Sequence, residues 1–173
     1  MTQYYFLNVE TMLDIGCGAG FPGMVLKIVY PHIKLTLLDS NNKKTTFCKN
    51  LKDILNVDNV IVINNRAEEY IKEKRESYDL VTARAVKNLP VLNELCIPYV
   101  KLNGFFIAMK SDYENELNNS LNGIKKLGGI YLETKNINLP NNSGTRNFII
   151  IKKEKVTDII FPRQYNQILK KPL

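Results

Sequence analysis

A cluster of glycines directly after a short apolar run constrains this chain more than any other feature. Four of the nine glycines fall in residues 16–23, which read GCGAGFPG. The preceding residues 12–15 read MLDI, as expected for a buried strand, and Pro22 suits the first turn of a following helix. Because glycine has no Cβ atom, such a strand–turn–helix unit can bend sharply and let a ligand approach its backbone. The sequence therefore predicts a ligand-binding turn at residues 16–23.

Alternating strands and helices through most of the chain predict an α/β fold. Short apolar runs alternate with amphipathic stretches, which implies parallel strands with helices on both faces of the sheet. Two final strands with no helix between them predict an antiparallel hairpin at one edge of a mostly parallel, seven-stranded sheet. The expected strands are 12–15, 33–38, 60–63, 80–82, 105–109, 131–136 and 148–152, and the expected helices are 22–30, 42–55, 67–74, 89–100 and 113–127.

The length of the chain and its lack of linkers favour a single domain. A chain of 173 residues lies within the usual size of one domain, and no internal repeat or Gly/Ser-rich linker divides it. We therefore expect one domain over residues 1–173. Residues 161–173 are rich in Lys and Pro and have weak periodicity, so we expect a basic tail that packs loosely across the surface.

The net charge of +7 favours an anionic partner, of which nucleic acid is the common case. Compositional bias is the alternative explanation, because 19 of the 24 cationic residues are lysine. Some of the lysines are candidates for phosphate contacts, and solvated helix faces explain some of them equally well. They are Lys43, Lys44, Lys125, Lys126, Lys152, Lys153, Lys155, Lys170 and Lys171.

Cysteine and histidine usage argues against a disulfide framework and against a metal site. The cysteines Cys17, Cys48 and Cys96 are widely and unequally spaced, no CxxC pair occurs, and His32 is the only histidine. The start of the chain lacks the pattern of a signal peptide, and the apolar runs are much shorter than the roughly 20 residues that span a bilayer. We expect a cytoplasmic protein with no membrane segment, and a monomer by default.

Two nucleoside cofactors fit the glycine-rich turn. Residues 18–23 match the G-x-G-x-x-G pattern of dinucleotide-binding enzymes, and Asp39 follows Gly18 by 21 residues, close to the spacing of the ribose-binding carboxylate. Residues 14–20 match instead the D-x-G-x-G-x-G opening of S-adenosylmethionine (SAM) methyltransferases. With either cofactor, Asp39 can accept hydrogen bonds from both ribose hydroxyls. The alternative without a ligand is a plain turn, with Asp39 as the cap of the next helix.

Residues 13–23, which read LDIGCGAGFPG, strongly resemble the RsmG (GidB) family, the small-subunit (16S) ribosomal RNA guanine-N7 methyltransferases. Further blocks match the family in the same order, and together the resemblance covers residue 9 to the end. It implies the Rossmann-like class I SAM-dependent methyltransferase fold. The further blocks are LLDS at 37–40, RAEE at 66–69, TARAV at 82–86, the strand 104–110, FPR at 161–163 and KKPL at 170–173.

The resemblance also implies which residues contact SAM. In the family, the first glycine of the turn, the apolar residue before its proline, the Ala-Glu pair after the third strand and the arginine after the fourth strand do so. Together with the rest of the turn and the ribose carboxylate, the candidates are Gly16, Gly18, Gly20, Phe21, Asp39, Ala67, Glu68 and Arg84.

The candidates Ala67, Glu68 and Arg84, which lie far from the glycine-rich turn in the sequence, could instead have purely structural roles. Ala67 and Glu68 could form an ordinary first helical turn, where a carboxylate is favourable in any case. Arg84 could simply pair with a nearby acid. We favour a functional role for Arg84, because a charge at the end of a buried strand needs a partner to offset its desolvation.

Methyl transfer to guanine N7 needs alignment more than acid–base chemistry, because N7 already presents a lone pair. The sequence lacks the N-P-P-Y or D-P-P-Y motif of exocyclic-amine methyltransferases and the Pro-Cys pair of carbon methyltransferases. We therefore expect catalysis by orientation and electrostatics, with Arg84 and Lys110 as candidates for positioning the cofactor, the base or a phosphate. The expected substrate is ribosomal RNA, either free or within the small ribosomal subunit.

Three departures from the family pattern leave other functions open. Only about ten residues precede the glycine turn here, where the family normally carries a further helical segment. Ser111 follows Lys110 where glycine is usual, and Asn166 and Ile168 replace the usual Gly and Pro of the closing motif. The alternatives are a SAM- or RNA-binding remnant without activity, a methyltransferase for another RNA or a small molecule, and, more distantly, an NAD-linked oxidoreductase.

Overall fold

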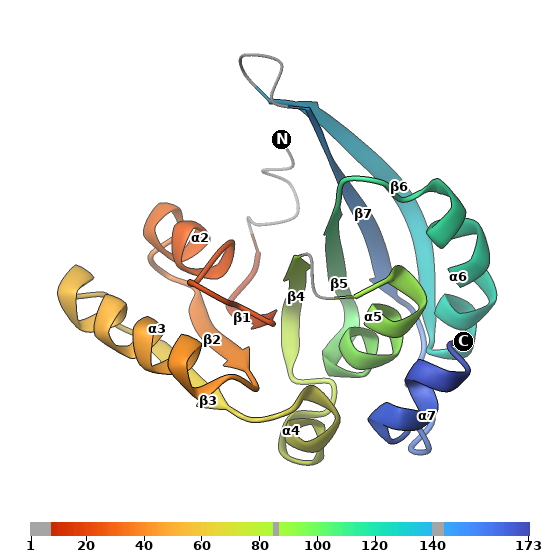
Figure 1. Cartoon of the computed structure of the whole chain (residues 1–173), viewed down its shortest axis with the longest axis horizontal. Helices are drawn as coiled ribbons and strands as arrows, with labels where there is room; N and C mark the ends of the chain where they lie inside the picture. Colours follow the sequence, from red (N-terminus) through yellow and green to blue (C-terminus); the bar gives the residue numbers. More distant parts are fainter. Residues whose placement is uncertain (1–7, 85–86, 140–143) are drawn as a thin grey trace.

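A computed structural model describes residues 8–84, 87–139 and 144–173 of the chain. These residues form a seven-stranded sheet with helices packed against it (Figure 1). The strands are β1 (Thr11–Ile15), β2 (Lys34–Asp39), β3 (Val60–Asn64), β4 (Tyr78–Arg84), β5 (Val100–Lys110), β6 (Gly129–Asn138) and β7 (Thr145–Lys153). The helices are α2 (Gly23–Val29), α3 (Asn42–Leu55), α4 (Ala67–Lys74), α5 (Leu89–Cys96), α6 (Glu114–Lys126) and α7 (Tyr165–Lys170), with a 3-10 turn η1 (Ile97–Tyr99).

The strand order is β3-β2-β1-β4-β5-β7-β6. The strands from β3 to β5 pair in parallel, whereas β7 pairs antiparallel with both β5 and β6. The expected α/β class, with a mostly parallel sheet and an antiparallel edge hairpin, is therefore confirmed. The chain moves outward from β1 to β3 and then crosses to β4 on the other side of β1. The carboxyl ends of β1 and β4 consequently flank the switch point at which α/β sheets bind ligands.

Each face of the sheet buries its own set of apolar side chains, because successive strand residues point to opposite faces. On one face, Leu13 of β1 belongs to a cluster with Leu92 of α5 and residues of α6. On the other face, Met12 belongs to a cluster with Met24 of α2 and Cys48 of α3. These two layers hold the ends of the central strands, and with them the glycine-rich turn, in fixed positions.

Residues 89–100 do not form the single helix expected from the sequence. Helix α5 ends at Cys96, η1 follows, and β5 begins directly at Val100. Pro98 explains the early end, because proline has no N–H group to continue the hydrogen bonding of the helix. Strand β5 is accordingly longer than the expected segment 105–109.

The expectation of a loosely packed tail over residues 161–173 is wrong. The Arg163 guanidinium donates hydrogen bonds to both carboxylate oxygens of Glu94, at 2.8 and 2.6 Å, and Glu94 is fully buried. The segment also contains the short helix α7, whose Ile168 side chain is 0% exposed. Periodicity misses this anchoring, because one ion pair and one apolar residue make no repeating pattern.

Candidate cofactor site

The turn between β1 and α2 has a backbone that requires glycine. At Gly20 the φ angle is +88°, and a Cβ atom would lie 2.9 Å from a side-chain carbon of α2. At Gly23 a Cβ atom would lie 2.7 Å from Leu37 Cδ2, so α2 approaches β2 more closely than a side chain permits. The Gly16 N–H group donates to the Leu38 carbonyl at 2.8 Å, which ties the turn to the end of β2. The glycine cluster therefore brings the turn and the ends of two strands together.

Asp14, near the end of β1, supports this turn from inside the protein. Its Oδ2 accepts a hydrogen bond from the Gly23 N–H group at 3.0 Å, and its Oδ1 accepts one from the Thr82 hydroxyl at 2.9 Å. Burial raises the pKa of Asp14 to about 7, although these two hydrogen bonds and the charge of Arg84 act in the opposite direction. The sequence showed this aspartate only as the first letter of a motif, and the structure gives it a supporting role.

The raised pKa of Asp14 predicts that the free energy of unfolding falls as the pH rises. Between about pH 4 and 7 the folded protein holds a proton that the unfolded chain has lost, so this carboxyl contributes a slope approaching about 1.4 kcal/mol per pH unit. In the Asp14→Asn variant the amide oxygen can accept from the Gly23 N–H group and the amide nitrogen can donate to the Thr82 hydroxyl oxygen. Because this amide does not titrate, the variant should lack the contribution. Denaturant titrations of both proteins across that range measure it. Equal slopes in the two proteins would contradict the prediction.

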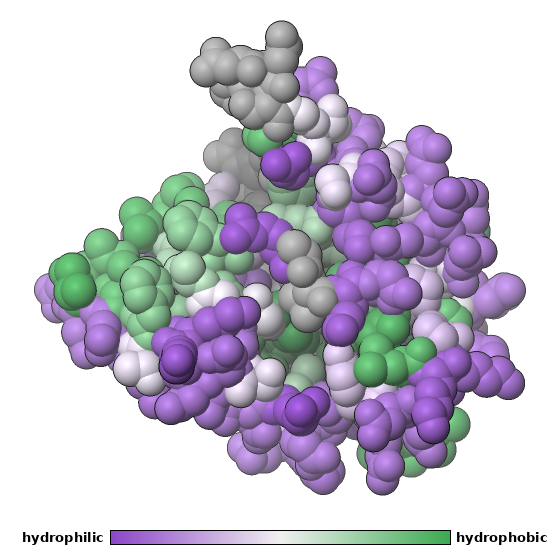
Figure 2. Space-filling view, viewed as in Figure 1, coloured by the Kyte–Doolittle hydropathy of each residue, from purple (hydrophilic) through white to green (hydrophobic). Residues whose placement is uncertain are grey.

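A cavity of about 460 Å³ lies at the carboxyl ends of β1, β2 and β4, where the sequence predicted a ligand. The space-filling view is hollowed near its centre, with apolar side chains inside and hydrophilic ones around much of the rim (Figure 2). The structure brings all but two of the predicted site residues together around this cavity. Those that line it are Gly16, Gly18, Phe21, Asp39, Ala67, Glu68 and Arg84.

Gly20 and Lys110 are placed elsewhere. Gly20 faces the interior, because the direction of a Cβ atom there points at side chains of α2 and α3. The Lys110 ammonium pairs with Glu116 at 2.8 Å and donates to the Lys87 carbonyl at 2.9 Å. Glu116 also accepts a hydrogen bond from the Leu89 N–H group. Lys110 therefore braces the backbone between β4 and α5, and does not line the cavity.

Asp39, at the end of β2, has both carboxylate oxygens engaged by backbone at the cavity wall. The Gly18 N–H group donates to Oδ2 at 3.1 Å, and the Asn41 N–H group donates to Oδ1 at 2.9 Å. The interpretation of Asp39 as the cap of the next helix is wrong, because Asn41 is the cap. The Asn41 side chain accepts hydrogen bonds from the first N–H groups of α3. Asp39 instead links the glycine turn to the end of β2.

The opposite wall is the first turn of α4. The Glu68 carboxylate lies 3.7 Å from the Arg66 guanidinium and keeps 10% of its side chain exposed. The buried Tyr99 donates its hydroxyl hydrogen to the Ala67 carbonyl at 2.6 Å, which fixes the start of the helix. Arg66 and Tyr165 also line the cavity, although the sequence did not single out either residue. The RAEE block carried a signal for Arg66, whereas nothing in the sequence pointed to Tyr165.

Arg84 is more exposed to solvent than expected from the sequence. It ends β4 as expected, but its side chain is exposed, so the argument from desolvation does not apply to it. Its guanidinium lies over the ring of Phe21 at 5.6 Å from the centroid, and 48% of Phe21 is exposed. A cation on an aromatic face therefore marks the mouth of the cavity next to the glycine turn.

Four cationic side chains, Lys44, Arg66, Arg84 and Lys87, are among the residues that line the cavity. Among the nine lysines considered for phosphate contacts, Lys153 is excluded by its burial. Its ammonium pairs with Glu76 at 3.2 Å, its side chain is 0% exposed, and burial lowers its pKa. Of the other eight lysines, Lys44 lies at the cavity.

The first turn of α2 distinguishes between the two cofactors suggested by the sequence. A pyrophosphate binds to free N–H groups at a helix N-terminus. Here the Gly23 N–H group donates to the Asp14 carboxylate and the Met24 N–H group donates to the Gly20 carbonyl. Pro22, which precedes them, has no N–H group. The first N–H groups of α2 are therefore already engaged within the protein and are not free for a pyrophosphate, so the site favours SAM, which carries no phosphate.

Comparison with known proteins agrees with this choice. Residues 1–145 match the GidB family, described as "rRNA small subunit methyltransferase G". The chain belongs to the GidB family. A Staphylococcus saprophyticus protein named "Ribosomal RNA small subunit methyltransferase G" is 47% identical over 94% of this chain and 69% of its own length. The protein of the same name from Bacillus subtilis is 43% identical over 97% of this chain and 72% of its own length.

Solved structures show that this GidB member has the fold of other methyltransferases. A precorrin-6y C5,15-methyltransferase from Geobacter metallireducens aligns with a TM-score of 0.65 at 15% identity, over 84% of this chain and 80% of that one. An rRNA methylase from Streptococcus thermophilus aligns with a TM-score of 0.62 at 13% identity, over 84% and 87% of the two chains. A protein from M. jannaschii, solved in complex with AdoMet, aligns with a TM-score of 0.65 at 15% identity, over 83% and 67%.

Two further findings concern metal and membrane. Within residues 8–84, 87–139 and 144–173, no group of His, Cys, Asp and Glu side chains is arranged to hold a metal ion. Within the same residues, the helices of this GidB member lack the length and hydropathy needed to cross a bilayer.

Proposed function

We propose that this chain transfers a methyl group from SAM to N7 of a guanine in small-subunit ribosomal RNA. The proposal rests on one observation: in a member of the GidB family, the glycine turn, Asp39 and the Ala67–Glu68 pair line a single cavity at the switch point of the sheet. Bound SAM supplies a methyl group activated by a positively charged sulfur. In our assignment Asp39 holds the ribose hydroxyls, and Ala67 and Glu68 contact the adenine.

In this proposal the protein accelerates the reaction mainly by positioning SAM and the guanine relative to each other. Guanine N7 presents a lone pair, so no residue is assigned as a general base, and alignment of the two reactants supplies most of the rate enhancement. Arg84 and Phe21 stand at the mouth of the cavity, where they can orient the incoming base. Lys110 is a positioning residue, because its bond to the Lys87 carbonyl braces the start of α5.

The charge around the cavity supports an RNA substrate. Lys44, Arg66, Arg84 and Lys87 line it, and cationic side chains at such a mouth contact phosphates with an affinity that falls as salt rises. Because structured RNA is recognised mainly by shape and by its backbone, we propose the small ribosomal subunit, with its RNA already folded, as the substrate.

Mapping of N7-methylguanine in ribosomal RNA, from cells with and without the gene, tests this function. We expect one guanine of the small-subunit RNA to lose its N7 methyl group when the gene is deleted, and to regain it when purified protein and SAM are added to the deficient subunits. Identical maps would contradict the assignment. A protein that binds SAM but leaves the map unchanged would be a remnant or would act on another substrate.

A further inference from the structure

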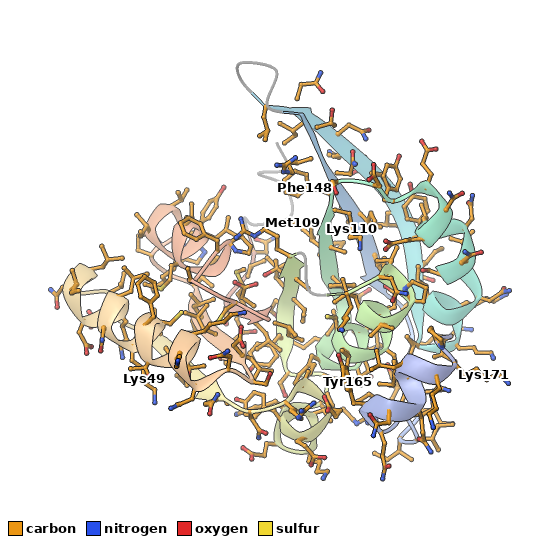
Figure 3. The ribbon with its side chains drawn as sticks, viewed as in Figure 1. Lys49, Met109, Lys110, Phe148, Tyr165 and Lys171 are labelled. Atoms are coloured by element: carbon orange, nitrogen blue, oxygen red, sulfur yellow. The ribbon has the colours of Figure 1, made fainter. Side chains whose placement is uncertain are left out.

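We propose that the C-terminal segment completes the cofactor site, with the Tyr165 ring as the wall at the adenosine end of the cavity. This inference deepens the proposed function and rests on it. Tyr165 is the first residue of α7 and lines the same cavity as Asp39 and Ala67. In the view with side chains, Tyr165 lies where α7 meets α4 and α5 (Figure 3).

The neighbours of the ring place it at the adenosine end. The Arg66 guanidinium lies over the Tyr165 ring, 5.7 Å from its centroid, and the same guanidinium lies 3.7 Å from the Glu68 carboxylate. A chain of contacts therefore runs from the ring to the side chain assigned to the adenine. An aromatic ring at this point offers a flat apolar surface, and purine bases stack well on such surfaces.

Independent anchors hold the segment that carries the ring. Two residues before Tyr165, Arg163 is bonded to the buried carboxylate of Glu94. After Tyr165, Ile168 is buried in the core, and the last residue, Leu173, packs so closely on α6 that a Cβ atom at Gly123 would lie 2.8 Å from it. Because the chain is anchored on both sides of Tyr165, the segment does not have to become ordered when the cofactor binds, which lowers the entropic cost of binding.

Calorimetry with three single variants tests the role of Tyr165. We expect Tyr165→Ala to weaken SAM binding by about 5- to 150-fold, as for loss of one aromatic stacking partner. Tyr165→Phe keeps the ring and should bind within about twofold of the wild type, since stacking does not need the hydroxyl. The control, Gln167→Ala, changes an exposed residue of the same helix and should leave the affinity unchanged.

Binding of a second ligand shows which part of the cofactor the Tyr165 ring contacts. 5′-Methylthioadenosine lacks the amino-acid end of SAM, so Tyr165→Ala should weaken its binding by the same factor if the ring acts on adenosine. Equal SAM affinities of Tyr165→Ala and the wild type would overturn the inference alone. A loss confined to SAM, with 5′-methylthioadenosine binding intact, would also overturn it. A wild type that binds neither ligand would instead refute the proposed function. Equal melting temperatures of the free variants verify that the fold is retained.

Discussion

Replacement of Arg163 by alanine is expected to lower the free energy of unfolding by about 3–5 kcal/mol, the cost of breaking a buried ion pair from one side. Glu94 is 0% exposed and receives three hydrogen bonds from Arg163, from the guanidinium at 2.8 and 2.6 Å and from the backbone N–H group at 2.9 Å. The variant keeps the backbone bond but leaves the carboxylate inside the protein without its counter-charge. Urea denaturation, followed by circular dichroism, measures the loss.

Two controls separate the ion pair from the packing of the segment. Lys170→Ala removes an exposed cation from the same C-terminal segment and should change the stability by less than about 0.5 kcal/mol. The double variant Glu94→Met with Arg163→Met removes both charges and should recover much of the stability, because a buried ion pair can often be replaced by apolar side chains without loss. A loss below about 1 kcal/mol in Arg163→Ala would show that the pair does not hold the segment.

Replacement of Asp39 by alanine is expected to weaken SAM binding by about 100-fold or more. In our assignment this carboxylate accepts two hydrogen bonds from the ribose, and hydrogen bonds to a charged group contribute roughly 1.5–3 kcal/mol each. Asp39→Ala also removes the acceptor of the Gly18 N–H group, which ties the glycine turn to β2. Isothermal titration calorimetry with SAM measures the affinity.

The matched control is Asp53→Ala, which removes an exposed carboxylate from α3 and should leave the affinity unchanged. Asp39→Asn should fall between the wild type and Asp39→Ala, because an amide keeps one acceptor but loses the charge. Binding of SAM by a folded Asp39→Ala variant at the affinity of the wild type would remove Asp39 from the cofactor site.

The parts of the fold that depend on local sequence were predictable. The turn at residues 16–23 combines a preceding apolar strand, clustered glycines and a proline, and each of these acts within a few residues. The position of Asp39 was predictable for a similar reason, because the second strand was expected to pair in parallel with the first, which places the ends of the two strands side by side. Its bond to the Gly18 N–H group is the structural consequence of that arrangement.

The parts that depend on distant partners were not predictable from one sequence. The match to the family's fifth strand makes Lys110 a candidate for positioning the cofactor, the base or a phosphate, but its side chain turns to Glu116 and the backbone of Lys87. The anchoring of residues 161–173 depends on a carboxylate in α5, and no spacing rule connects the two. Tyr165 lines the cavity from this same segment, so its place was not predictable either.

The structure of this protein with bound S-adenosylhomocysteine tests the central claim most directly. We predict that its ribose hydroxyls contact Asp39, that its adenine lies beside Ala67 and Glu68, and that its amino-acid end lies on the turn at Gly16. A nucleoside bound elsewhere, or one in this cavity whose ribose does not contact Asp39, would contradict the account.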